Sequence, residues 1–95
     1  MLNYLLLTEA DTQQALAGYL RQQRKQLKLS RHALAERSTV PASTIKKFEL
    51  SGQISLRQFL LLWESLDDLR RIYALTQAEQ TPEPVPQTIE DVLRQ

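Results

Sequence analysis

Two adjacent lysines, Lys46 and Lys47, are the residues of this 95-residue chain whose type and position best suit contact with an anion. Apolar Ile45 and Phe48 flank them, a spacing that turns the flanking residues inward on a helix. Three small residues precede them: Ala42, Ser43 and Thr44. Small leading side chains let a helix approach a surface closely, so the lysines could reach phosphates or guanine edges. A solvated lysine pair on an ordinary helical hairpin has the same local pattern.

A second candidate anion contact lies at Ser30 and Arg31. Ser30 is a natural N-cap, and a helix start combined with a cation suits a phosphate. Residues 12–52 contain eight Lys/Arg against two acidic residues, a net charge of +6, whereas the rest of the chain carries −5. A basic block inside a nearly neutral chain predicts either a phosphate-binding face or a solvated helical surface.

Catalytic and metal-binding arrangements are not apparent in the sequence. His32 is the single histidine, and the absence of cysteine excludes disulfides and thiolate metal sites. The acidic pairs Asp67-Asp68 and Glu90-Asp91 are typical of helix starts, where the helix dipole favours negative charge. We therefore expect no enzymatic activity, no metal site and no cofactor.

The apolar spacing predicts an all-α chain. A first helix begins with a capping box at either Thr8 and Asp11 or Asp11 and Gln14, and the clean period from Thr12 favours the second. A second helix runs from the Ser30 cap to about Ser38. A turn with an inward Val40 follows, and then a third helix with Pro41 in its first turn. The third helix ends near Leu50, with Gly52 in the left-handed conformation. The expected inward residues of these helices are Leu16, Tyr19, Leu20, Leu27, Leu34, Ala35, Ile45 and Phe48.

A fourth helix is predicted from a capping box at Ser55 and Gln58, and a fifth from Asp67 or Asp68. The expected inward residues are Leu56, Phe59, Leu60, Trp63 and Leu66 in the fourth helix and Leu69, Ile72 and Tyr73 in the fifth. Leu61 and Leu62 of the fourth helix are not among these expected inward residues. Together with Ile72, Tyr73 and the apolar residues 2–7, they predict a homodimer interface, although a well-filled core would also use them.

The two ends of the chain differ from its middle. Residues 1–11 form an apolar segment too short for a signal peptide, and no stretch is long enough to span a membrane, so we expect a soluble cytoplasmic protein. Residues 76–95 contain a proline-rich linker and then a capped amphipathic stretch with Ile89, Val92 and Leu93 on one side. This stretch is either a docking element for another protein or a frayed tail.

Residues 16–75 resemble the Xre family of helix-turn-helix regulators, which includes the phage lambda-type repressors. The resemblance is carried by the Leu34-Ala35 pair, Val40, Ser43-Thr44-Ile45, Glu49 and the closing "SGQISL". It implies a lambda-repressor-like five-helix DNA-binding domain over residues 12–75, with a flexible C-terminal tail. It also implies dimeric binding to palindromic operators in double-stranded DNA, with bases read by the third helix.

The resemblance also assigns roles by position. Arg31, beside Ser30, takes the place of a phosphate contact. Ala42, Ser43 and Lys47 take base-facing places, with Thr44 and Lys46 near the DNA backbone. Arg24 and Glu49 match a pair that links the first helix to the third. Two residues depart from the family pattern: Thr39 stands where glycine is usual, so a positive φ there would be strained, and Pro41 replaces a Ser/Thr cap.

Within this family the chain looks most like HipB-type antitoxins, which are paired with HipA-like kinase toxins. The expected function is therefore that of an autorepressing antitoxin, associated with the nucleoid when bound to DNA. Two alternatives remain open: a stand-alone Xre-family repressor, and a protein-interaction module that uses the same fold without DNA.

Overall fold

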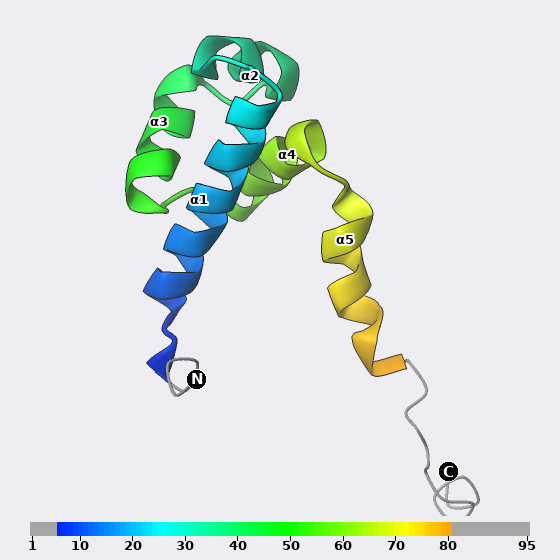
Figure 1. Cartoon of the computed structure of the whole chain (residues 1–95). Coiled ribbons are helices and arrows are strands. Elements are labelled where there is room, and N and C mark those ends of the chain that lie inside the picture. Colours follow the sequence, from blue (N-terminus) through cyan, green and yellow to red (C-terminus); the bar gives the residue numbers. More distant parts are fainter. Residues whose placement is uncertain (1–5, 81–95) are drawn as a thin grey trace, which may run out of the picture.

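The computed structural model describes residues 6–80, and over this range the chain is all-helical, as the sequence predicts (Figure 1). The elements are α1 (Glu9–Gln26), α2 (Arg31–Ser38), α3 (Ala42–Ser51), α4 (Leu56–Leu66), α5 (Leu69–Tyr73) and the 3-10 helix η2 (Ala74–Gln80). The expectations for residues 1–5 and for the C-terminal stretch with Ile89, Val92 and Leu93 lie outside the described residues.

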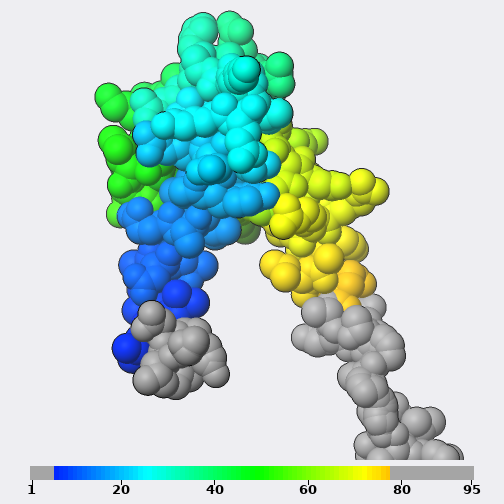
Figure 2. Space-filling model, in the orientation of Figure 1, coloured from blue at the N-terminus to red at the C-terminus, as the bar shows by residue number. Residues whose placement is uncertain are grey.

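The helices α1 to α4 pack together, whereas α5 and η2 leave the end of α4 as a projecting arm (Figure 1). We call residues 69–80 the arm. The arm and the N-terminal half of α1 point in the same direction, with open space between them (Figure 2). The core comprises Ala17, Leu20, Leu34, Val40, Ile45, Phe48, Phe59, Leu62, Trp63 and Leu66. It draws on α1 to α4 and on the turn between α2 and α3.

The first helix begins earlier than the favoured prediction of Thr12. Thr8 is its N-cap: the Asp11 backbone N–H donates to the Thr8 hydroxyl (3.1 Å), and the Thr8 N–H donates to the Asp11 carboxylate (3.2 Å). Both halves of the first candidate box are therefore formed, and they add a helical turn before the clean apolar period. At the other end, Leu27 is the C-cap and is 51% exposed, so its predicted inward position is wrong.

The inward face of α4 differs from the prediction at two leucines. Leu56, the first residue of the helix, is 72% exposed, whereas Leu62 is buried. The buried face consists of Phe59, Leu62, Trp63 and Leu66, a spacing of three and four residues that keeps all of them on one stripe. Ser55 caps the helix as expected by accepting a bond from the backbone N–H of Gln58 (3.1 Å). Leu62 is therefore a core residue and is not available to an interface.

The fifth helix begins after the cap Asp68 but does not lie flat on the core. Leu69 and Tyr73 are exposed, contrary to prediction, and Ile72 alone of the three packs against the core. The reason is the extended backbone at Asp67 (φ −152°, ψ −153°), which turns the chain away from α4. A five-residue helix placed in this way buries little of its own surface.

A polar cluster fixes the base of the arm. The Arg71 guanidinium donates to Asp67 (2.8 Å) and to the Tyr19 hydroxyl (2.9 Å), and this hydroxyl donates to Asp67. The hydrogen bond from Tyr19, the backbone N–H of Asp68 and the charge of Arg71 hold the pKa of Asp67 below its usual value. α1 is thereby connected to the joint between α4 and α5.

Candidate functional site

The connection between α2 and α3 is short and tightly held. Ser30 caps α2 as predicted by accepting a bond from the Ala33 N–H (2.9 Å). Thr39 adopts the left-handed conformation (φ 66°), so the position expected to be strained does have positive φ. The Ser38 hydroxyl accepts a bond from the Val40 N–H (3.1 Å), and Val40 is buried. These contacts set α3 at a defined angle to α2.

The helix α3 has one face in the core and another in solvent. Ile45 and Phe48 are almost fully buried, and Gly52 ends the helix in the left-handed conformation (φ 80°), both as predicted. Pro41 is the N-cap rather than the first helical residue, and its carbonyl accepts bonds from the N–H groups of Thr44 and Ile45 (both 3.0 Å). Because the cap has no side-chain bond, neighbouring N–H groups at this helix start remain free to contact a ligand.

The solvent face of α3 carries the residues that the sequence singled out. Ser43, Lys46 and Lys47 are exposed, and Ala42 and Thr44 are half-buried. Within residues 6–80 neither lysine forms an ion pair. The helix lies at the outer edge of the packed helices, where its side chains project into solvent (Figure 2). A basic, sterically open helical surface of this kind is suited to a negatively charged partner.

The side chain of Glu49, also on α3, is buried and paired with arginines. The Arg24 side chain donates from Nε (2.7 Å) and Nη2 (3.0 Å) to the two carboxylate oxygens, the ion pair expected from the sequence. Its Nη1 donates to the Leu29 carbonyl (2.9 Å). The two paired side chains are only 9% and 3% exposed. This bidentate contact joins α1 to α3 where water is largely excluded.

Arg31 joins the same carboxylate, which the sequence analysis did not anticipate. Its Nε donates to Glu49 (2.9 Å), and its side chain is 33% exposed. Burial acts to raise the pKa of Glu49, but the hydrogen bonds and charges of Arg24 and Arg31 outweigh it and hold that pKa below its usual value. The sequence did hold one indication of this contact. Residues 12–52 contain eight basic residues but only two acids, Glu36 and Glu49, so more than one basic side chain is available to pair with Glu49.

The geometry leaves part of Arg31 free for a ligand. The bond to Glu49 uses Nε, and no bond from its two terminal nitrogens is formed among the described residues. A guanidinium held in this way presents a pre-oriented pair of N–H groups, the arrangement that matches phosphate. Glu49 therefore both anchors α3 and orients the exposed end of Arg31.

His32, the single histidine of the chain, lies away from the buried network. His32 lies 3.4 Å from Glu36 on the exposed side of α2. Over residues 6–80, no three His, Asp or Glu side chains come together as they would around a metal ion. No helix in that range has the length and apolar character needed to cross a membrane.

The chain matches no family model, no curated protein and no solved structure. The described residues form a small helical protein. Its helix α3 carries exposed lysines and is held in place by the buried contacts of Glu49 with Arg24 and Arg31.

Proposed function

We propose that the protein is a sequence-specific regulator that binds double-stranded DNA, with α2, the turn and α3 acting as a helix-turn-helix. The observation that carries the proposal is the division of α3 into two faces. Ile45 and Phe48 fix one face in the core, while the other presents small residues followed by two lysines that form no ion pair with any other described residue. A recognition helix needs this combination, because it must enter the major groove without losing its own support.

The proposed contacts follow from position and exposure. Ala42, Ser43 and Lys47 face base edges, where lysine suits guanine and an alanine methyl suits thymine. Thr44 and Lys46 lie near the DNA backbone. Ser30 and Arg31 at the start of α2 bind a phosphate through a helix N-terminus and a pre-oriented guanidinium. The small side chains of α3 leave part of the specificity to DNA shape.

The salt dependence of binding to duplex DNA tests the proposal. Affinity for random duplex should fall steeply with salt, because each phosphate contact releases bound cations. Replacing both Lys46 and Lys47 by Ala should weaken binding and lower the slope of log affinity against log salt by about 1, the contribution of the proposed Lys46 phosphate contact. If Lys47 reads a base, its replacement alone should weaken binding to a selected operator by about 1–3 kcal/mol.

Lys25→Ala is the matched control for the single replacement of Lys47, since Lys25 is an exposed lysine of the same basic block in the last turn of α1. It should change affinity much less than the α3 variants. If the Lys25 variant and the α3 variants weaken binding equally, the affinity comes from non-specific charge attraction and not from α3 in particular. Unchanged affinity for the α3 double variant, with its helical content intact, would reject α3 as the binding helix.

The proposal includes a homodimer on a palindromic operator, which would set two α3 helices on the order of 34 Å apart. It also includes an antitoxin role beside a HipA-like kinase toxin, supported by the resemblance to HipB-type antitoxins. The segment expected to contact the toxin, with Ile89, Val92 and Leu93, lies outside the described residues. A chain truncated after Gln80 should keep DNA binding and lose a co-purified toxin. A truncated chain that retains the toxin would assign that contact to the helical domain.

A further inference from the structure

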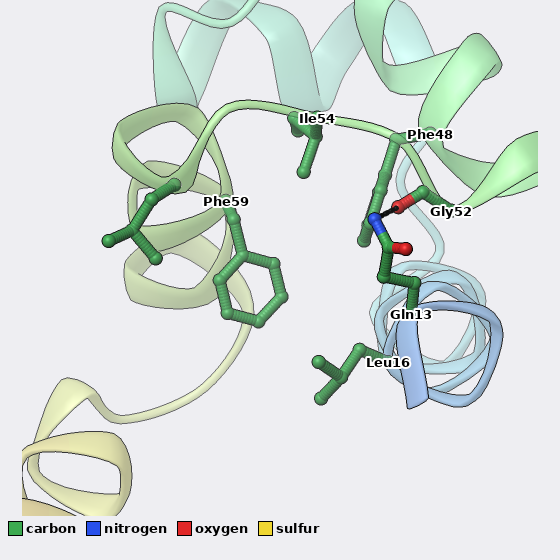
Figure 3. A pocket seen from close by; sticks show the side chains of 7 residues that line it. Gln13, Leu16, Phe48, Gly52, Ile54 and Phe59 are labelled. Carbon is green, nitrogen blue, oxygen red and sulfur yellow. Dashed lines mark hydrogen bonds between the residues drawn. The ribbon is translucent and has the colours of Figure 1, made fainter. Parts of the chain in front are cut away.

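Two adjacent hollows lie on the side of the molecule where α1 faces α4 and the arm. The first, of about 240 Å³, is enclosed by α1, the end of α3 and α4 (Figure 3). Its lining residues are Gln13, Leu16, Phe48, Gly52, Ile54, Leu56 and Phe59. The second, of about 230 Å³, lies between α1, α4 and the arm, and is lined by Leu16, Phe59, Trp63, Arg71, Ile72 and Leu75. Since Leu16 and Phe59 line both hollows, the two form one continuous apolar surface.

The chemistry of this surface suits aliphatic side chains. Leu56 at one hollow and Leu75 at the other are each 72% exposed. The Gln13 amide, which is the one uncharged polar side chain in the two linings, already donates to the Gly52 carbonyl (3.2 Å; Figure 3). A small polar ligand would therefore find few groups to orient it, whereas exposed apolar surface of this kind marks a protein contact.

We propose that residues 88–95 of the same chain dock on this surface. Ile89, Val92 and Leu93 are spaced so that a single helical turn puts all three on one face. They span about 6 Å of helix axis, which suits two neighbouring hollows. A cavity of about 150 Å³ already admits a benzene ring, so each hollow has room for a branched aliphatic side chain. The acidic pair Glu90-Asp91 complements Arg71, the charged lining residue.

The linker is long enough to bring the segment back. Gln80 lies five residues beyond Leu75, or about 10 Å along a 3-10 helix. The seven residues 81–87 reach about 22 Å when extended in the polyproline conformation, so the chain can return to the hollows after one turn near residue 81.

Residues 88–95 can dock through so small a contact because they are covalently attached to the domain that carries the hollows. Three aliphatic side chains on a segment of eight residues bind weakly as a free peptide, because the segment must be ordered on binding. A short linker supplies an effective concentration on the order of 1 mM, so docking within one chain is favoured over docking between chains. When residues 88–95 are docked, their apolar side chains are covered by the hollows. A second protein can bind these side chains only after the segment leaves the hollows.

Trp63 is the single tryptophan of the chain and lines the second hollow, so its fluorescence reports directly on occupancy. The test compares the full chain with a chain truncated after Gln80, without DNA. Truncation should shift Trp63 emission to longer wavelength and increase its quenching by acrylamide. A peptide of residues 88–95 at millimolar concentration should reverse both changes. Because DNA is absent, the result is independent of whether the protein binds an operator.

Point variants of the full chain refine the test. Val92→Asp should reproduce the effect of truncation, whereas Arg94→Gln, off the apolar face and without a role in the proposed contact, should change the emission much less. Identical emission from the full and truncated chains would overturn the proposal. An emission difference that grows with protein concentration would assign the docked segment to a second copy, against the proposal. The same effect from deleting residues 2–5, with none from truncation, would assign the hollows to the N-terminal segment and also overturn it.

Discussion

Glu49 is the residue on which α1, α2 and α3 converge. Its carboxylate accepts bonds from Arg24 and Arg31, and its side chain is 3% exposed. Removing one partner of a buried ion pair leaves the other charge without compensation. The stability of the three-helix unit therefore depends strongly on this one acid.

Replacing Glu49 by Ala should lower the free energy of unfolding by about 3–5 kcal/mol, because two arginines lose their shared acceptor. Urea unfolding followed by circular dichroism measures this loss. Glu36→Ala is the control, since Glu36 is exposed and its carboxylate lies 3.4 Å from His32 on the surface of α2. Its effect should stay within about 0.5 kcal/mol. Equal effects from the two variants would mean that the network adds nothing beyond a surface ion pair.

Among the described residues, Lys28 and Thr39 are the two non-glycine residues with positive φ, and Thr39 is the β-branched one. Its φ of 66° lies in the left-handed region, which costs a residue with a Cβ about 1–2 kcal/mol. Thr39→Gly should therefore raise the urea midpoint. The net gain should be up to about 1 kcal/mol, since glycine loses more entropy on folding. Thr39→Ala keeps the Cβ and should show no such gain. A stability loss for Thr39→Gly would show that the Thr39 side chain contributes more than the strain removes.

At the scale of the elements, the arm is held mainly at its base. Tyr19, Asp67 and Arg71 form the polar cluster there, and Arg71 also lies over the Tyr19 and Trp63 rings, 5.9 Å from each centroid. Beyond this cluster α5 contains no buried residue. An element anchored in this way opens locally at a lower free energy than the helices of the core.

Tyr19→Phe should loosen the arm without unfolding the core. The variant loses two hydrogen bonds, the one that the Tyr19 hydroxyl donates to Asp67 and the one that it accepts from Arg71. A net loss of about 1–2 kcal/mol corresponds to roughly 5- to 30-fold faster cleavage of the locally opened arm. Trypsin cleavage after Arg70 and Arg71 measures this opening. Tyr73→Phe is the control, since Tyr73 is 65% exposed. If both variants are cleaved at the wild-type rate, the Tyr19 hydroxyl does not hold the arm.

The elements that the sequence predicted correctly depend on local chemistry. The caps at Ser30 and Ser55 and the end at Gly52 require contacts within a few residues, and these contacts are present. The start of α1 was wrong because two capping boxes overlap at Asp11, and the apolar period does not show which of them forms. Local patterns thus predict where helices begin and end only when one cap is available.

Positions set by packing between distant segments were less accessible from sequence. Leu56 and Leu62 both fit an apolar helix, and the contact of α4 with α1 and α2 decides which one is buried. The exposure of Leu69 and Tyr73 follows from the extended backbone at Asp67, which no apolar pattern encodes. In the candidate site, the pairing of Arg24 with Glu49 was expected from the resemblance, whereas the contribution of Arg31 depends on how α2 meets α3.

At the scale of the whole molecule, the apolar surface that remains exposed bears on the proposed dimer. Leu62 is removed from the predicted interface by burial, whereas Tyr73 of the arm is 65% exposed. Leu6 and Leu7 are also exposed, at the start of the described chain. Tyr73 lies at the end of α5, and Leu6 and Leu7 precede α1, so the proposed dimer would use exposed residues from both of these segments.

We expect a dimer in sedimentation at micromolar concentration, and Tyr73→Asp should shift it toward monomer because a charge is placed on the apolar contact. Leu27→Asp is the control. Leu27 is 51% exposed but lies at the C-terminal end of α1, whereas Leu6 and Leu7 of the proposed contact precede its N-terminal end. A wild-type monomer with and without DNA would contradict the dimer. Dissociation by both variants would point to a general effect of added charge.

The separation of the two faces of α3 has a consequence for how this protein can evolve. Ser43, Lys46 and Lys47 form no side-chain hydrogen bonds or ion pairs within the described residues, whereas Ile45, Phe48 and Glu49 hold the helix in place. Under the proposed function, mutations at the first three positions would therefore change what the helix recognises while the fold keeps its support. Duplicated copies of such a chain could diverge in target through a few codons, and each intermediate would still fold.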